Sequence, residues 1–298
     1  MALPEDYWAS FEATAASLAE VLDAVRMISA YQARTGARFA WRGVSNARWP
    51  LYSSVVRAYL RRNRNILPTE RQLRVFEATI LGEARSWGLD WHSSGGLLTA
   101  LELLAALQHY GVPTRLVDFT FSPLIALWFA AEGEEEEDGR LFAIDISTRP
   151  VDRLDAESSE PWWLRIGPGA ATAWTKESWV WIPPPFEPRI VRQQGCFLMG
   201  GIPSTQPQRS VRRGRGWRLL RANEVRACMS LPFRLITYQQ AVSAFAGQRL
   251  RGQPPRAFTL RVRNKREIRK QLDQAFDLSH RSLFPDFPGL RQYGRSFA

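Results

Sequence analysis

The chain has 298 residues, 45% of them apolar, so it can bury a sizeable core without disulfides or metals. Its 2 cysteines and 3 histidines are too few and too scattered for a disulfide scaffold or a zinc cluster, so we expect no metal. The longest mainly apolar run, residues 97–107, falls short of the roughly 20 residues that cross a bilayer. Residues 1–7 lack the basic start of a secretory signal. These features predict a cytoplasmic protein with no membrane partner.

The net charge of +11 is unevenly distributed along the chain. Residues 189–298 hold 22 Lys and Arg against 5 Asp and Glu, whereas residues 1–188 hold 18 against 24. A positive field attracts polyanions, so we expect a nucleotide or nucleic acid as partner, with an acidic protein as a further possibility. Because only 3 of the 40 basic residues are lysines, the arginine excess has a compositional explanation as well. The residues predicted to bind nucleic acid are Arg209, Arg212, Arg213, Arg215, Arg218 and Arg221.

Periodicity and capping signals predict the elements in chain order. The sequence predicts Gly36 as the stop of the first helix, Thr69 as an N-cap, and Gly111 as the stop of a very apolar helix. Ser122-Pro123 supplies an N-cap followed by proline at N1, and Asn264 with Glu267 resembles a capping box. Helices are expected over 10–34, from Thr69, over 96–110, 124–131 and 264–276, strands over 38–42, 114–120, 140–146, 177–182, 190–199, 231–238 and 256–262, and loops at the acidic run 134–138 and over 200–216.

This order places helices first and strands later, and the chain shows no internal repeat. No linker is long or polar enough to argue for two domains. The sequence therefore predicts one α+β domain in which a helical N-terminal part packs on a mixed, strand-rich sheet. Within it, residues 1–37 form an N-terminal helical segment, and residues 38–298 form one continuous globular unit.

Four motifs together resemble the FRG domain, a family named for an aromatic-Arg-Gly motif. The chain departs from the family at Trp41, which replaces Phe or Tyr, and at Val117 and Phe119, which replace Leu and Trp. The resemblance spans about residues 38–294 and implies a bacterial protein with a defence or toxin-like role. The matching segments are Trp41-Arg42-Gly43, residues 107–116 (LQHYGVPTRL) followed by Asp118, Thr120 and Ser122-Pro123-Leu124, then Arg189-Ile190 with Gln193-Gln194-Gly195 and Phe197, and finally residues 283–286 with Gly289-Leu290.

The layout is similar to that of ADP-ribosyltransferases, which have an Arg or His on an early strand, a Tyr or Ser/Thr motif in the middle and a Gln-x-Glu or Glu on a late strand of a split mixed sheet. By that analogy Arg42 binds the phosphate or ribose of NAD, Tyr110 stacks on nicotinamide, and Gln194 takes the late position. A neutral glutamine stabilises the developing ribosyl cation poorly, so either Asp118 supplies the charge or the activity is different. The expected catalytic residues are therefore Arg42, Tyr110, Asp118 and Gln194, and the expected ligand-binding residues are Arg42, His109, Arg115, Thr120, Ser122 and Gln193.

Structural interpretations of the same residues stay open. Arg42 is expected either at a ligand or as a buried organiser that bonds backbone carbonyls or Asp118. In the structural interpretation, His109 caps the end of a helix and Tyr110 is a core aromatic. Gln193 and Gln194 pair with backbone groups. At the level of the whole protein, the alternative to an enzyme is a non-catalytic module that binds nucleic acid or a partner, and a metal nuclease is a weaker third option.

Overall fold

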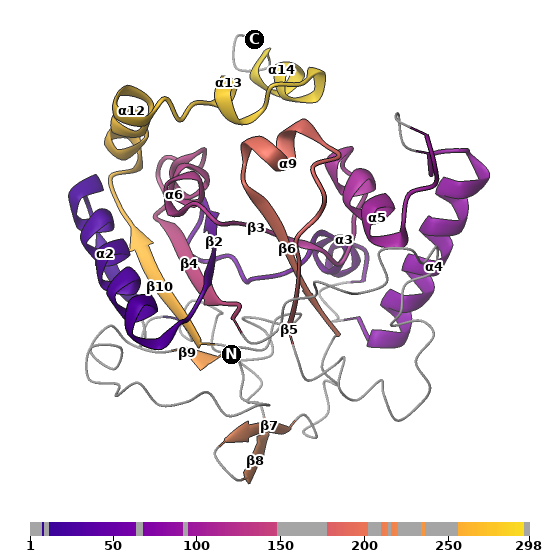
Figure 1. Ribbon diagram of the computed structural model, residues 1–298, viewed down its shortest axis with the longest axis horizontal. Coiled ribbons are helices and arrows are strands. Elements are labelled where there is room, and N and C mark those ends of the chain that lie inside the picture. Colours follow the sequence, from indigo (N-terminus) through magenta and orange to yellow (C-terminus); the bar gives the residue numbers. More distant parts are fainter. Residues whose placement is uncertain are drawn as a thin grey trace.

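A computed structural model gives the arrangement of the chain (Figure 1). It describes residues 8, 12–63, 68–91, 95–147, 178–201, 210–213, 216–219, 234–235 and 256–294.

The described strands form one mixed sheet and a separate hairpin. The sheet has eight strands in the order β1-β10-β4-β2-β3-β6-β5, with β9 also paired to β10. Most neighbours are antiparallel, but β1 and β9 each run parallel to β10. The strands of the sheet are β1 (Glu12–Ala15), β2 (Phe39–Val44), β3 (Val117–Thr120), β4 (Gly139–Asp145), β5 (Ser178–Trp181), β6 (Gly195–Gly200), β9 (Arg234–Leu235) and β10 (Arg256–Val262), and those of the hairpin are β7 (Ser210–Arg213) and β8 (Gly216–Leu219).

The helices mostly precede or flank these strands. Thr69 and Thr99 each begin a helix through a complete capping box, and Ser122 accepts the backbone N–H of Ile125 with Pro123 at the first helical position. The described helices are α2 (Leu18–Thr35), α3 (Ser54–Arg62), α4 (Glu70–Ser86), α5 (Ala100–His109), α6 (Pro123–Ala131), α9 (Pro188–Arg192), α12 (Lys265–Phe276), α13 (His280–Leu283) and α14 (Phe287–Gly294).

The sheet consists of two halves that meet at a narrow seam. Strand β2 runs beside β4 along its whole length, from Phe39 to Val44. By contrast, β2 and β3 are in register only where Trp41 faces Thr120. Figure 1 shows β2, β4 and β10 in one half and β5 and β6 in the other, with α6 and α9 at the same end of the sheet. We call the Trp41–Thr120 junction the seam.

Three apolar clusters hold the halves and helices together. Alternate residues of β2, β4 and β10 point to opposite faces, so Trp41, Leu141 and Phe258 pack under α2, α6 and α12, whereas Phe142 lies in a cluster on the other face. The third cluster packs α4 and α5 against β5 and β6 and includes Trp181. The prediction of one α+β domain with helices on a mixed sheet is confirmed.

Gly43 explains how α6 approaches the sheet so closely. A Cβ atom at this position would lie 1.8 Å from the carbonyl oxygen of Ala126 and 2.5 Å from the backbone nitrogen of Ala130. Only glycine therefore allows the helix backbone to rest directly on β2. The residue does not end the strand, as its sequence suggested, but lies within it.

Several element predictions need correction. The first helix begins at Leu18, not residue 10, because Ser17 caps it and Glu12–Ala15 pairs with β10. Residues 190–199 are not one strand, because Pro188 starts the short helix α9 before β6. The loop expected over 200–216 includes strand β7, which pairs with β8 in a hairpin. Helix α3 was not predicted.

The capping and surface predictions also differ in part. Asn264 precedes α12 in a left-handed conformation and makes no side-chain cap. The acidic run is a loop, as expected, with residues 134–136 exposed and 137–138 partly buried, and Glu135 pairs with Arg266 and Arg269 of α12. Among the described helices, none is long and apolar enough to cross a membrane.

Candidate functional site

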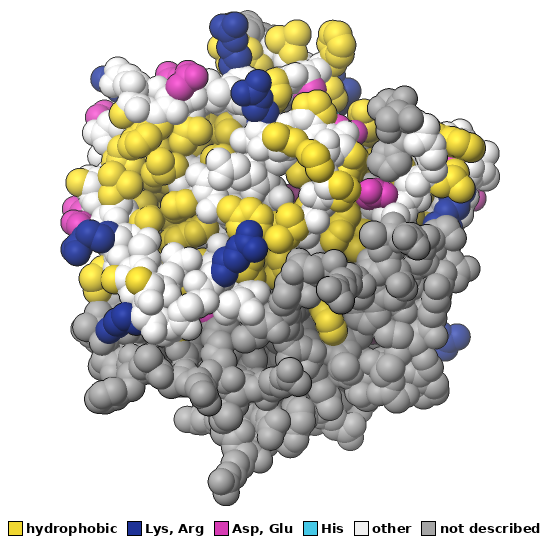
Figure 2. Space-filling view, viewed as in Figure 1, with side chains coloured by type: hydrophobic (Ala, Val, Ile, Leu, Met, Phe, Trp, Pro, Cys, Tyr) yellow, Lys and Arg dark blue, Asp and Glu magenta, His cyan; other side chains and the backbone are white. Residues whose placement is uncertain are grey.

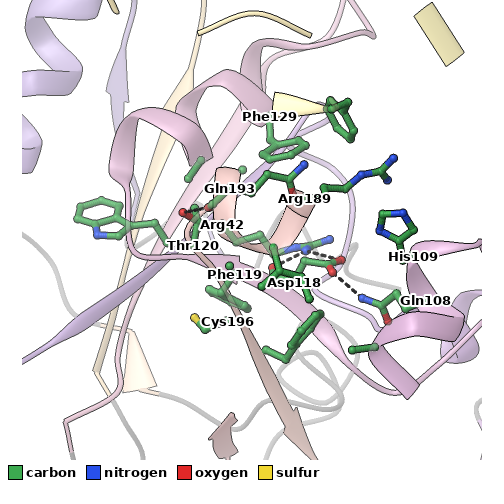
Figure 3. A pocket seen from close by; sticks show the side chains of 18 residues that line it. Arg42, Gln108, His109, Asp118, Phe119, Thr120, Phe129, Arg189, Gln193 and Cys196 are labelled. Carbon is green, nitrogen blue, oxygen red and sulfur yellow. Dashed lines mark hydrogen bonds and ion pairs between the residues drawn. The ribbon is translucent and has the colours of Figure 1, made fainter. Parts of the chain in front are cut away.

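A pocket opens at the seam between the two half-sheets. Its cavity volume is about 290 Å³. Strands β2 and β3 form its floor, and side chains from α5, α6, α9 and the segment after α13 form its walls (Figure 3). The lining residues are Trp41, Arg42, Gly43, Ala105, Gln108, His109, Asp118, Phe119, Thr120, Ala126, Phe129, Arg189, Ile190, Gln193, Gly195, Cys196, Phe197 and Phe284.

Arg42 projects from β2 into this pocket. Its Nη1 donates a hydrogen bond to the backbone oxygen of Asp118 at 2.6 Å and lies 3.7 Å from the Oδ2 of the same residue. The Nε atom is buried and has no hydrogen-bond partner among the described residues. Burial lowers the pKa of Arg42, and the charge of Asp118 offsets this only in part. The Arg42 side chain is 17% exposed, so the guanidinium is a partly buried cation whose hydrogen-bonding capacity is incompletely used among the described residues.

Asp118 faces the same pocket from β3. Its side chain is 65% exposed, so the carboxylate is accessible from the cavity. Gln108, on the last turn of α5, donates its Nε2 to Asp118 Oδ1 at 2.5 Å. Figure 3 shows Arg42 and Gln108 on either side of this carboxylate. The pocket therefore presents an accessible anion held between two donors.

A second charged group lies on the opposite wall. Arg189 of α9 donates through Nε and Nη2 to the two carboxylate oxygens of Asp286, at 2.9 and 2.6 Å. The guanidinium lies 4.8 Å from the ring centroid of Phe284. His109 approaches the same carboxylate at 3.7 Å, and burial, followed by the charge of Arg189, lowers its pKa. Asp286 is thus held by two short hydrogen bonds from Arg189, whereas the side chain of Asp118 meets Arg42 only at 3.7 Å and is more exposed.

Thr120 and Gln193 close the seam through backbone contacts. The Thr120 hydroxyl donates to the carbonyl of Gln193 at 2.7 Å and accepts from the backbone N–H of Ser122 at 3.0 Å. Gln193 donates its Nε2 to the carbonyl of Leu283 at 3.0 Å. Thr120 and Gln193 line the pocket, whereas Ser122 serves as the N-cap of α6.

Four of the predicted site residues do not line the pocket, namely Ser122, Tyr110, Gln194 and Arg115. Tyr110 is 69% exposed at the end of α5, so it is neither a core aromatic nor a wall of the cavity. Gln194 adopts a left-handed conformation with φ of 48°, and its side chain is exposed. Arg115 is fully buried against Glu77 and Glu70, away from the cavity, because two carboxylates of α4 compensate its charge there. Of the predicted set, the structure brings together Arg42, His109, Asp118, Thr120 and Gln193.

Cys196 lines the pocket as a buried thiol. Burial raises its pKa to about 12, so the reactive thiolate is scarce near neutral pH. The thiol therefore contributes an inert, apolar surface to the cavity.

Three of the six predicted nucleic-acid-binding arginines belong to the described strands β7 and β8. The backbone of Arg212, Arg213 and Arg218 belongs to the two strands, whereas Arg209, Arg215 and Arg221 lie outside the described residues. Figure 2 shows hydrophobic side chains over much of the described surface, with Lys and Arg side chains standing singly among them. The described part of this face therefore carries no continuous basic patch.

Several pocket residues were not among the predicted site residues. Gln108 lies within the segment 107–116, and Arg189 lies within a later segment that resembles the FRG family, as does its partner Asp286, which is outside the pocket lining. Membership of a matching motif was the available signal, because nothing in local spacing reveals that Arg189 and Asp286 meet. Phe129 and Phe284 complete the apolar wall.

Comparisons with known proteins give one result. The family model of the FRG domain matches residues 37–139, which include β2, α3, α4, α5, β3 and α6. No curated protein and no solved structure gives a match. In the part of the chain that the structure describes, no group of three or more His, Cys, Asp or Glu side chains is arranged to hold a metal ion. The chain thus contains an FRG domain at residues 37–139, and this segment supplies Arg42, Gln108 and Asp118 to the pocket.

Proposed function

We propose that the pocket binds a nucleotide, with NAD as the leading candidate, and that the protein is an ADP-ribosyltransferase-like enzyme. The observation that carries the proposal is the accessible carboxylate of Asp118 beside the partly buried guanidinium of Arg42 at the seam. The cavity of about 290 Å³ suits one part of a dinucleotide, and the remainder would extend along the surface.

Arg42 supports an anionic ligand. Its buried Nε lacks a partner among the described residues, and a buried donor without one is costly. A phosphate or ribose oxygen would satisfy this donor, and the planar fork of arginine allows two parallel bonds to one phosphate. Arg42 therefore serves as the clamp that holds the nucleotide in this proposal.

Asp118 supports the chemical step. When the bond between nicotinamide and ribose breaks, nicotinamide leaves with the bonding electron pair and becomes neutral, and the positive charge passes to the ribosyl group. An acceptor then attacks the ribosyl carbon through an oxygen or nitrogen atom and loses its proton. A fixed carboxylate stabilises the developing cation. Because Gln194 lies outside the pocket and Asp286 is paired with Arg189, Asp118 is our candidate for this role.

The test is the release of nicotinamide from NAD by the purified protein, with DNA, RNA and protein offered as acceptors. Asp118→Asn should lower turnover by about 10²-fold or more while leaving thermal stability and affinity for ADP-ribose nearly unchanged. Asp273→Asn, at an exposed aspartate of α12, is the matched control and should keep full turnover. If the wild type releases no nicotinamide with any acceptor, the transferase proposal is wrong.

Nucleic acid is the proposed acceptor, on the strength of the positive charge of residues 189–298. Phosphate contacts make such binding steeply dependent on salt, because counterions are released. Affinity for DNA or RNA should fall at least about tenfold between roughly 50 and 200 mM salt, and should weaken when Arg212, Arg213 and Arg218 are replaced together by glutamine. Undetectable binding at low salt, or binding that ignores salt, would remove nucleic acid from the proposal.

A further inference from the structure

A chain of hydrogen bonds leads from the backbone to the Asp118 carboxylate, and its direction is fixed at the start. The backbone N–H of Leu116 donates to the hydroxyl oxygen of Thr114 at 3.2 Å. A backbone N–H can only donate, and a hydroxyl has a single hydrogen. That hydrogen is directed at the side-chain oxygen Oε1 of Gln108, which contacts the Thr114 hydroxyl directly.

Thr114, at the start of this series of hydrogen bonds, is held rigidly. Thr114 is fully buried. Its backbone N–H donates to the hydroxyl of Ser54 at 2.9 Å, and the Ser54 hydroxyl donates back to the Thr114 carbonyl at 3.1 Å. Ser54 is the first residue of α3, so the loop before β3 is tied to that helix. The Thr114 hydroxyl is therefore held where it meets Gln108.

The orientation of the Gln108 amide follows from this contact. The two ends of a glutamine amide are told apart by their partners, and here Oε1 must face the hydroxyl hydrogen. Nε2 then faces Asp118 Oδ1, at 2.5 Å, and can only donate. On the other side Arg42 Nη1, also only a donor, lies 3.7 Å from Oδ2. Both carboxylate oxygens thus face donors, and these two contacts fix the orientation of the carboxylate.

We infer that Gln108, oriented by Thr114, is a positioning residue that holds the Asp118 carboxylate in place in the pocket, and that the pocket consequently selects a ligand with a positively charged ring over its neutral counterpart. This inference rests on the proposed function, because the ring in question is the nicotinamide of NAD. Oxidised NAD carries a positive charge on that ring and reduced NAD does not. Opposite charges at a partly exposed site should give the oxidised form an advantage of about five- to tenfold in affinity.

Calorimetric titration of the full chain with oxidised and with reduced NAD tests the inference. Gln108→Leu removes the donor to Asp118, and Thr114→Val removes the hydroxyl that orients it. Both variants should reduce the preference for oxidised NAD to about twofold or less. Thr114→Ser keeps the hydroxyl and should keep the preference. Gln271→Leu is the matched control, because Gln271 also donates to a carboxylate, that of Glu267, but on the exposed surface of α12.

The outcomes separate the inference from the proposed reaction. Equal affinity of the wild type for the two dinucleotides overturns the inference, as does a preference that Thr114→Val leaves intact. A wild type that prefers oxidised NAD and loses the preference in Thr114→Val but not in Thr114→Ser supports it, even if no nicotinamide is released. Absence of binding of either dinucleotide overturns both the inference and the proposed function. The serine variant keeps the test decisive if Gln108→Leu fails to fold.

Discussion

Two arginines of the FRG domain, Arg115 and Arg42, stand in contrasting surroundings. Arg115 donates from Nε to Glu77 at 2.6 Å and from Nη1 to Glu70 at 3.0 Å, with its side chain fully buried. Arg42 has one backbone carbonyl, a carboxylate at 3.7 Å and an unpartnered Nε. At Arg115 the charges of the two glutamates outweigh the effect of burial, so the pKa lies above its ordinary value. At Arg42 burial outweighs the charge of Asp118, so the pKa lies below its ordinary value.

The difference in how the two guanidinium groups are satisfied distinguishes a structural arginine from a ligand-binding one. A buried cation whose charge and donors are satisfied inside the protein stabilises the fold. A partly buried cation left incompletely satisfied beside a cavity has capacity for a ligand. The sequence predicted a ligand-binding role for both arginines, and the geometry supports it for Arg42 alone.

The largest effect is expected at Arg115. Arg115→Met should lower the free energy of unfolding by about 3–5 kcal/mol, because buried Glu77 would lose its partner. Urea unfolding followed by circular dichroism measures the change. The double variant Arg115→Met with Glu77→Leu should recover part of the loss, since no isolated buried carboxylate remains at that position. If Arg115→Met is as stable as the wild type, Arg115 does not have the structural role that distinguishes it from Arg42.

The opposite pattern is expected at Arg42. Arg42→Ala should weaken nucleotide binding by about 100-fold or more while lowering the free energy of unfolding by only about 1 kcal/mol, because the accessible Asp118 stays hydrated. Arg42→Lys should not restore binding, since lysine lacks the planar fork. Calorimetric titration and urea unfolding on the same samples provide both numbers. A large loss of stability with binding retained would make Arg42 an organiser like Arg115.

An intermediate effect is expected at Arg189, which is paired with Asp286 but lines the pocket. Arg189→Lys loses the two-bond contact with the carboxylate and the flat contact with Phe284. We expect a loss of about 1 kcal/mol in stability and a several-fold loss in nucleotide affinity. Asp286→Asn keeps the arginine and should affect stability more than affinity. If both variants change stability and nucleotide affinity to the same extent, Arg189 has a structural role only and does not contact the nucleotide.

The smallest effect concerns the pH dependence of stability through His109. Its pKa is lowered in the folded protein, by burial first and then by Arg189, so below the ordinary value of 6.5 the unfolded chain binds a proton that the folded chain does not. Stability should therefore fall as the pH decreases through that range. His109→Gln should show a smaller loss of unfolding free energy between pH 7.5 and 5.5. An equal loss in variant and wild type would assign the pH dependence to other groups.

Local signals predicted much of the fold correctly. Thr69 caps α4, Ser122-Pro123 starts α6, and the strand at 256–262 has the bounds of β10. Each of these features depends on residues within a few positions of one another. The strand Glu12–Ala15 and the short helix α9 were missed. The first depends on pairing with β10, and the second contains Ile190 and Val191, two β-branched residues that also suit a strand.

The site was harder to predict than the fold because its charges meet over long sequence distances. Arg42 and Asp118 lie in recognisable motifs, and both line the pocket. The partners of Arg115, by contrast, come from α4, and Arg189 meets Asp286 through the packing of α9 against the segment after α13. No spacing rule indicates which carboxylate neutralises which arginine, so the sequence could not separate structural from ligand-binding cations.

The missing side chain of Gly43 determines the dimensions of the pocket. Helix α6 carries Phe129, one wall of the cavity, and rests on β2 where any Cβ would collide with the Ala126 carbonyl. Substitutions of increasing size at position 43 would lift this helix stepwise and widen the cavity without altering a single charged or hydrogen-bonding group that lines it. The aromatic-Arg-Gly motif thus offers protein engineers separate controls, with charge adjusted at its second residue and aperture at its third.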